Sequence, residues 1–244
     1  MIFASVDLNK ESLEEFLASL NEIRDSKFDG VEICLWEDMT NYLKGVKEGL
    51  KKEDLKSNVH NDIMKIENGL ESCKEKINSN LRFSKGIGAT FFISHPIQPY
   101  SPNLELSKGL FDTLKEEILI ETVQGIGLEE LKFLNKPVVL DTGNLIKNGE
   151  YGRLTEYKDV KWVHIHDFKD GQDHLPLGEG KLNLSPIISL FRNIGFTIEI
   201  GNKFRRWREI SKSYRRPIDY LNNSLTFSKS YGKNVRLKHL LNLV

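Results

Sequence analysis

The segment Trp162–Gly180 gathers side chains that can do chemistry. It holds three of the six histidines of the chain, namely His164, His166 and His174. If the first two lie at the end of a strand, their spacing of two residues places both rings on one face. The turn Gly178–Gly180 allows the backbone to approach another group closely. Imidazoles arranged in this way bind a metal ion or a polyol. Two core histidines beside a solvated loop are the plainer alternative.

Runs of β-branched and aromatic residues alternate with amphipathic segments along the whole chain. We expect strands at 2–6, 30–36, up to 60, 89–95, 117–121, 137–141, 162–166 and 196–200. We expect helices from 12 to about 20, up to about 52, and at 66–85, 104–114, 128–134, 184–194 and 218–227, with Gly195 as the cap of the helix 184–194. No Pro/Gly/Ser-rich linker divides the chain. Eight alternating units predict a single α/β domain over residues 1–244, folded as a (β/α)8 TIM barrel.

Metal-capable side chains recur at the expected ends of these strands. They are His60, His95, Glu121, Asp141, His164, His166 and Glu199. In a parallel barrel the carboxyl ends of all strands open on one mouth, where active sites lie. Buried carboxylates are costly unless they are paired or bind a cation. Each residue alone is most simply an ordinary polar group at a strand end, but three carboxylates beside histidines predict a divalent metal site.

The composition excludes a membrane-spanning or disordered chain. Charged residues make up 29% and apolar residues 39% of the sequence, and the mean hydropathy is −0.40. No apolar run approaches the length of about 20 residues that a spanning helix needs. The start of the chain does not resemble a signal peptide, so we expect a cytoplasmic protein. Cys34 and Cys73 are isolated and are expected to be buried thiols.

The charge is unevenly distributed, although the chain as a whole carries none. Residues 203–244 hold eleven Lys or Arg and two acidic residues, so this basic C-terminal segment carries +9 and residues 1–202 carry −9. Arginines interleaved with Trp207 and Tyr214 suit phosphate or DNA. A basic face packed on the acidic body is the alternative. The candidate phosphate ligands are Arg205, Arg206 and Arg208.

Four strand-end motifs resemble those of the xylose-isomerase-like barrels, which hold sugar and sugar-phosphate isomerases and epimerases and also endonuclease IV. The motifs are ILIETVQG, VVLDTGN, VHIHD followed by GEG, and FTIEI. The HxxD and GEG pair is the most specific of them. The resemblance implies one divalent ion, Mn, Co, Zn or Mg, held by Glu121, Asp141, His164 and Glu199. The resemblance is also compatible with a second ion.

Part of the sequence is similar to endonuclease IV in particular, which binds three zinc ions. His60, His95 and His174 have counterparts among its ligands. Asn144 and Gln172 stand where that family has a His and an Asp, which leaves His174 alone at the third zinc position. The resemblance therefore implies one or two ions rather than three.

Three functions follow as hypotheses. The first is a metal-dependent isomerase or epimerase of a small sugar or sugar phosphate, in which the resemblance gives Glu121 and Glu199 the roles of catalytic acid and base. His166 is then a candidate substrate contact. The second is a DNA-repair phosphodiesterase, an AP endonuclease of the endonuclease IV kind, with DNA on the basic C-terminal segment. The third is a barrel that only binds a ligand. The sequence is compatible with a homo-oligomer.

Overall fold

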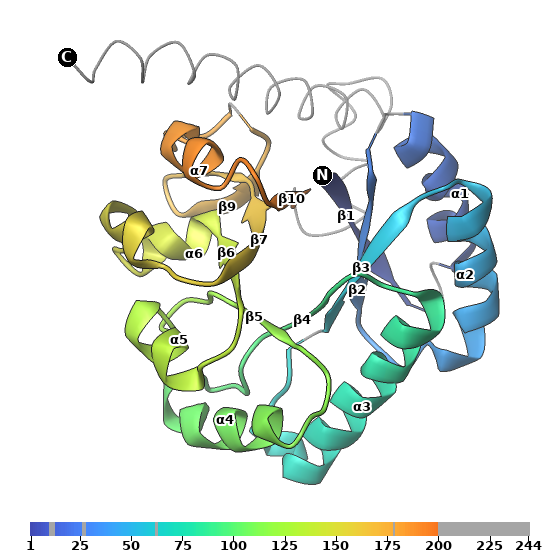
Figure 1. The fold of residues 1–244 in the computed structure, drawn as a ribbon, viewed down its shortest axis with the longest axis horizontal. Coiled ribbons are helices and arrows are strands. Elements are labelled where there is room, and N and C mark those ends of the chain that lie inside the picture. The colour runs from blue at the N-terminus through green and yellow to red at the C-terminus, as the bar shows by residue number, and fades with distance from the viewer. Residues whose placement is uncertain (10–12, 26–27, 62, 178, 200–244) are drawn as a thin grey trace.

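A closed barrel of eight parallel strands forms the centre of the molecule (Figure 1). The computed structural model describes residues 1–9, 13–25, 28–61, 63–177 and 179–199. The barrel strands are β1 (Ile2–Leu8), β2 (Gly30–Leu35), β3 (Lys56–Asn61), β4 (Phe92–Ser94), β5 (Leu119–Glu121), β6 (Val138–Asp141), β7 (Val160–Ile165) and β10 (Gly195–Ile198). Each strand pairs with its neighbours in sequence, and β10 closes the barrel on β1. The predicted (β/α)8 fold is confirmed.

Seven α-helices of the described residues surround this barrel (Figure 1). They are α1 (Leu13–Asp25), α2 (Leu43–Lys52), α3 (Leu70–Ile87), α4 (Leu104–Asp112), α5 (Leu128–Leu134), α6 (Thr142–Lys147) and α7 (Ser185–Leu190). Helix α1, for example, buries the apolar stripe of Phe16, Leu20 and Ile23. None of the described helices is long and apolar enough to cross a membrane. The expected helix 218–227 and the basic C-terminal segment lie outside the described residues.

Two elements near the mouth were not expected. A short helix, α6, begins where strand β6 ends, because Asp141 caps it by accepting a hydrogen bond from the backbone N–H of Asn144 at 2.7 Å. Strands β8 (Asp167–Lys169) and β9 (Gln172–Leu175) form an antiparallel hairpin after β7. Its turn is Asp170-Gly171, with φ of 51° and 83°, as a two-residue hairpin turn with both φ positive requires.

The inside of the barrel is layered because side chains alternate along each strand. The buried residues Phe3, Ile93, Leu119, Val139 and Trp162 form an apolar plug. On each of the last four strands represented in this plug, the residue two positions later carries a metal-capable side chain. These residues are His95, Glu121, Asp141 and His164. The apolar plug therefore lies directly below the polar mouth.

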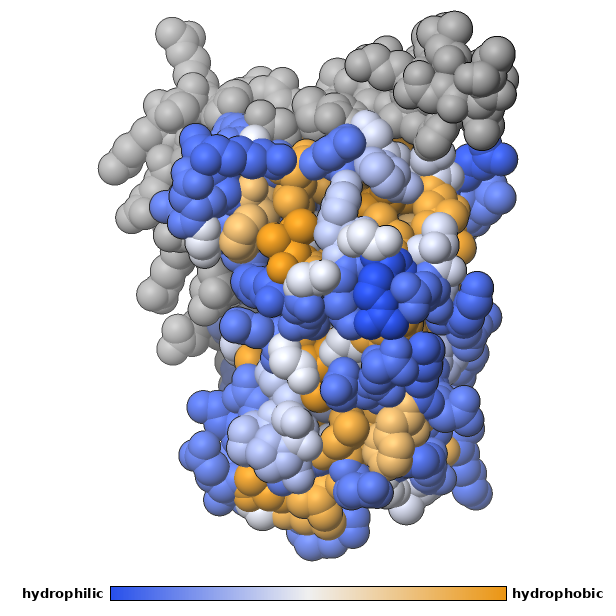
Figure 2. All heavy atoms as spheres, turned by 90° about the vertical axis from the view of Figure 1, so that its left-hand side faces the viewer, coloured by the Kyte–Doolittle hydropathy of each residue, from blue (hydrophilic) through white to orange (hydrophobic). Residues whose placement is uncertain are grey.

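Large apolar side chains on the outer surface are scattered. Phe133 on α5 and Leu190 on α7 are exposed to 38% and 47%. Figure 2 shows this side of the molecule, where hydrophobic areas are separated by hydrophilic ones. Scattered apolar groups of this kind are ordinary on protein surfaces.

Gly195 does not cap the preceding helix, contrary to the sequence-based expectation. Helix α7 ends at Leu190, and Gly195 is the first residue of β10, where it pairs with Trp162 of β7. A Cβ atom at this position would lie 1.9 Å from the indole ring of Trp162. The glycine is therefore required by the bulk of the tryptophan in the plug, and not by a helix end.

We predict that Gly195→Ala destabilises the fold by about 1–3 kcal/mol, the usual cost of overpacking a core. Gly109→Ala is the matched control, because Gly109 lies inside α4 with nothing within 4 Å of its Cβ position. The control should be neutral or stabilising by up to about 1 kcal/mol, since alanine favours helix. Urea denaturation of both variants measures the two effects. Equal stability of the two variants would contradict the steric explanation.

Candidate metal centre and active site

The four expected metal ligands meet at the mouth of the barrel. Glu121 and Asp141 are the last residues of β5 and β6, His164 lies on β7, and Glu199 directly follows β10. Asp141 and His164 are register partners across β6 and β7. One ligand atom from each of the four residues lies within 4.8 Å of the others. The neighbouring strands β5, β6, β7 and β10 thus deliver one group each to a single point.

His164 is the centre of this group. Its Nδ1 lies 3.2 Å from Oε1 of Glu121 and 3.2 Å from Oε2 of Glu199. Although these contacts are short, Nδ1 of His164 and Oε2 of Glu199 are buried and form no well-aligned hydrogen bond. Buried polar atoms without partners cost about 1–3 kcal/mol each. A cation coordinated by these atoms removes that cost.

The donor set fits a divalent ion. Three carboxylates and one imidazole are hard and borderline ligands, a mixture that Mn, Co, Zn and Mg accept. The carboxylate of Asp141 already accepts hydrogen bonds from Asn144 and from Nε2 of His166, each at 2.7 Å. A carboxylate has about four lone-pair sites, so Asp141 retains the capacity to bind a metal.

The electrostatics of the site show strong mutual pairing. Burial acts to lower the pKa of His164, but Glu32, Glu121 and Glu199 raise it well above its usual value. Burial likewise acts to raise the pKa of Glu121, but His164, His95 and His60 bring it well below its usual value. The buried carboxylates are therefore stable only beside positive charge, which imidazolium groups or a metal ion can supply.

A second group of three potential ligands adjoins the first and shares Glu121 with it. Nε2 of His60 lies 3.0 Å and Nε2 of His95 lies 2.9 Å from Oε2 of Glu121. The two nitrogens are 3.3 Å apart. His60 is in β3 and His95 directly follows β4. The structure thus brings together three potential ligands of a second ion.

The third group differs from what the sequence indicated. His174 is not alone, because its ring stacks on that of His166 at a centroid distance of 4.3 Å, and both lie with Asp141 in another set of potential ligands. His166 is fully buried between Asp141 and Asp173, at 2.7 Å and 3.1 Å. The side chain of Asn144 points away from this group and donates to the carbonyl of Thr122 at 3.0 Å.

Burial and two neighbouring carboxylates determine the pKa of His166. Burial acts to lower the pKa of His166, but Asp141 and Asp173 raise it to about 9. Its ring therefore serves as a positive link between β6 and the β8–β9 hairpin. The substrate contact suggested for His166 stays a prediction.

Two further expectations concern loop and cysteine residues. The close approach expected at the GEG turn occurs at Gly180, where a Cβ atom would lie 2.0 Å from Oδ1 of Asp167. Cys34 and Cys73 are both free. Cys73 is buried as expected, whereas Cys34 is only partly buried and lies with His60 and Glu199 in a further set of potential ligands. Burial raises the pKa of the Cys34 thiol to about 11. The phosphate candidates Arg205, Arg206 and Arg208 lie outside the described residues.

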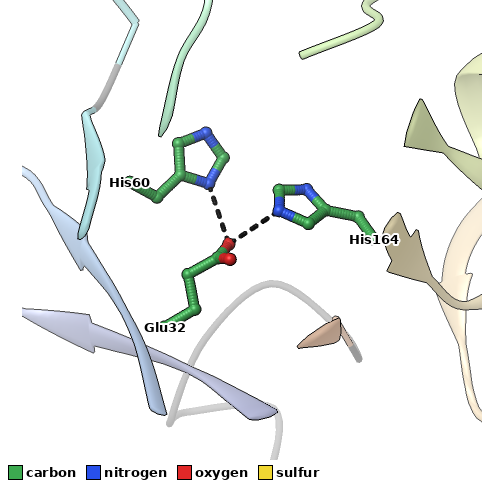
Figure 3. A group of neighbouring side chains, drawn as sticks. All are labelled: Glu32, His60 and His164. Atoms are coloured by element: carbon green, nitrogen blue, oxygen red, sulfur yellow. Dashed lines mark ion pairs between the residues drawn. The ribbon is translucent and has the colours of Figure 1, made fainter. Parts of the chain in front are cut away.

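Sequence reasoning missed Glu32, which lies in the middle of β2. Its side chain is fully buried, and Oε1 lies 2.8 Å from Nε2 of His164 and 3.4 Å from Nδ1 of His60 (Figure 3). The signal was present, because a lone carboxylate in the apolar run 30–35 has no solvent to face. It was overlooked because it is not at a strand end.

Comparison with known proteins places the fold. No family profile matches the sequence, and no curated protein matches it. Among solved structures, D-allulose 3-epimerase from Methylomonas sp. in complex with D-allulose has a TM-score of 0.73 at 13% identity, covering 94% of this chain and 97% of that chain. The 3-keto-D-glucoside 4-epimerase from E. coli has a TM-score of 0.67 at 13% identity, covering 94% and 100%.

A third solved structure has a similar fold. A xylose isomerase domain protein from Alicyclobacillus acidocaldarius subsp. acidocaldarius has a TM-score of 0.67 at 14% identity, with coverage of 96% of this chain and 100% of that chain. Identities this low establish the fold and leave the activity open. The protein has the fold of the xylose-isomerase-like barrels, as its strand-end motifs indicated. Within that fold, it carries a mouth lined by carboxylates and histidines.

The site predicts stabilisation by divalent cations. Adding Mn²⁺, Co²⁺ or Zn²⁺ at about 100 times its dissociation constant should stabilise the protein by about 2.7 kcal/mol, because an ion that binds only the folded state shifts the unfolding equilibrium. His164→Ala should abolish the increase in Tm. Glu150→Gln should keep it, since Glu150 is a buried carboxylate that binds the backbone of Leu128 away from the site. Scanning calorimetry with and without metal measures both, and a shift that survives in His164→Ala would place the ion elsewhere.

Proposed function

We propose that this protein is a divalent-metal-dependent isomerase or epimerase of a small sugar or sugar phosphate, which transfers a proton at a carbon next to a carbonyl group. The observation that carries the proposal is the position of Glu121 and Glu199. Both carboxylates lie 3.2 Å from the same nitrogen of His164. They come from β5 and β10, which β6 and β7 separate in the barrel. Two carboxylates therefore approach one point from two sides.

This arrangement suits removal and return of a proton. One carboxylate takes the proton from the carbon next to the carbonyl, which leaves an enediolate, and the other returns a proton to the opposite face or to the neighbouring carbon. When bound, a divalent ion supplies electrostatic stabilisation of the negative charge on the substrate oxygens. Asp141 and His164 act as ligands. The side chain of Glu199 is 16% exposed, whereas that of Glu121 is 5% exposed, so Glu199 is the more accessible base.

Similar structures support the substrate class. Those described above include epimerases of D-allulose and of a 3-keto-D-glucoside, whose reactions both invert a carbon of a small sugar. The buried donor set supports a metal-assisted reaction of the same kind in this protein. A phosphate on the substrate is a further proposal, with the arginines at 205, 206 and 208 as its candidate ligands.

The first test follows hydrogen exchange from the substrate. With metal-loaded protein in D₂O and D-fructose or D-allulose as substrate, we expect the proton signal of the carbon next to the carbonyl to disappear. Glu199→Gln should slow this exchange by about 10²–10⁴-fold, the usual effect of removing a general base. Elemental analysis must show that the variant still carries metal. Glu150→Gln should exchange at the wild-type rate.

Two outcomes of this experiment count against the proposal in different ways. Exchange at the wild-type rate in metal-loaded Glu199→Gln removes the role of Glu199 as a base. Absence of exchange in wild-type protein with ketoses, aldoses and their phosphates removes the proposed reaction itself.

The group of His60, His95 and Glu121 favours a second candidate function. Two adjacent ions sharing a carboxylate are typical of phosphodiesterases and nucleases, so an endonuclease acting on DNA at abasic positions is the alternative proposal. Its other support in the sequence is the basic C-terminal segment. A single-metal isomerase and a two-metal nuclease differ in the number of metal ions bound per chain, which is simple to measure.

We predict one tightly bound ion per chain, no cleavage of duplex DNA that contains an abasic position, and no retention of the protein on DNA at low salt. Elemental analysis after dialysis gives the metal count, and His95→Ala should leave that count at one. Two or more ions per chain, together with DNA cleavage and a steep dependence of DNA binding on salt, would reverse the order of the two candidates.

A further inference from the structure

Glu32 is a buried carboxylate to which the proposed reaction gives no role. It lies in the middle of β2, and its exposed fraction is 0%. A carboxylate at such a depth is costly unless its oxygens are fully occupied. Its two oxygens make different contacts: Oε2 accepts from Thr197, and Oε1 faces His164 and His60.

A directional chain of hydrogen bonds holds Oε2 of Glu32. Nε1 of Trp162 donates to Oγ1 of Thr197 at 2.7 Å, and the Thr197 hydroxyl donates to Oε2 of Glu32 at 2.7 Å. An indole N–H is a donor only, so the Thr197 hydroxyl accepts from Trp162 and directs its own hydrogen to Glu32. The apolar plug thereby anchors one side of the carboxylate.

The other oxygen faces the histidines of the mouth, as Figure 3 shows. Oε1 lies 2.8 Å from Nε2 of His164 and 3.4 Å from Nδ1 of His60. The contact with His164 is close, although it is not a well-aligned hydrogen bond. The other ring nitrogen, Nδ1, faces Glu121 and Glu199. When a cation takes the lone pair of Nδ1, the proton of the neutral ring is on Nε2, where Oε1 of Glu32 is the acceptor beside it.

We propose that Glu32 is a positioning residue, which holds the proton of His164 on Nε2 and so leaves Nδ1, the nitrogen that faces Glu121 and Glu199, available to a divalent ion. The inference rests on the proposed function insofar as it takes the mouth to be a metal centre. A neutral imidazole has one donor and one acceptor nitrogen, and a metal ligand must use the acceptor. A carboxylate on the far nitrogen fixes that choice and the orientation of the ring.

The test is the metal affinity of variants that change the acceptor without changing the shape. In Glu32→Gln, the hydroxyl of Thr197 still needs an acceptor and takes the amide oxygen, which turns the amide NH₂ toward Nε2 of His164. The proton then moves to Nδ1, where it competes with the ion. We expect the Kd for Mn²⁺ or Zn²⁺, measured by competition with a chelating dye, to rise by about 10–100-fold, as for other groups that orient metal ligands.

Two further pairs of variants separate positioning from loss of structure. Thr197→Val removes the donor to Glu32 and should weaken metal binding, whereas Thr197→Ser keeps the hydroxyl and should restore it. Glu150→Gln neutralises another buried carboxylate, one that binds the backbone of Leu128, and should leave the Kd unchanged. Circular dichroism at the temperature of the binding experiment confirms that each variant is folded.

A direct readout is available in wild-type protein and does not depend on any variant folding. In ¹⁵N-labelled, Zn²⁺-loaded protein, correlation spectra of the imidazole nitrogens should show His164 protonated on Nε2 and bound to metal through Nδ1. Binding through Nε2, an unchanged Kd in folded Glu32→Gln, or a wild-type protein that binds no divalent ion would each overturn the inference. None of these measurements requires turnover, so failure of the isomerase proposal with metal binding intact leaves this inference standing.

Discussion

Charge balance in a mouth with little water is the constraint on which the site depends. Glu32, Glu121 and Asp141 are each exposed to 4% or less, and His164 is not exposed at all. Carboxylates in such surroundings persist only with positive charge beside them. Each of these three carboxylates indeed contacts at least one imidazole ring. A divalent ion at the common point of the four candidate ligands would balance the same charges with less reliance on protonated histidines.

The barrel produces this concentration of charge by a simple rule of alternation. Inward-facing residues recur every second position along a strand, so an apolar residue of the plug is followed by a polar residue of the mouth. Leu119 precedes Glu121, Val139 precedes Asp141 and Trp162 precedes His164 in this way. The plug supplies the burial that stabilises the fold, and it also supports the polar layer, since Trp162 donates to Thr197 beneath Glu32.

The sequence predicted the barrel and the meeting of Glu121, Asp141, His164 and Glu199, because each stands at or just beyond the end of an apolar run. The assignment of these residues to a metal stays a prediction. Glu32 escaped notice because it interrupts an apolar run instead of ending it. The β8–β9 hairpin is not among the predicted elements, although Asp170-Gly171 is a strong turn signal. Its strands are too short for a visible period of alternation. Contacts between distant segments, such as Glu32 with His164, have no local signal at all.

The contact of Gly195 with Trp162 has a consequence for the history of the sequence. The two residues are register partners on β10 and β7, and the glycine leaves the space that the indole ring occupies. Neither position is free to change alone, since a side chain at 195 needs a smaller ring at 162. Among related chains the two positions should covary, with large residues alternating between them. A chain with the opposite arrangement would lack the indole N–H that donates to Thr197. A substitution at either position would therefore affect both the packing of the plug and the hydrogen bonds that hold Glu32.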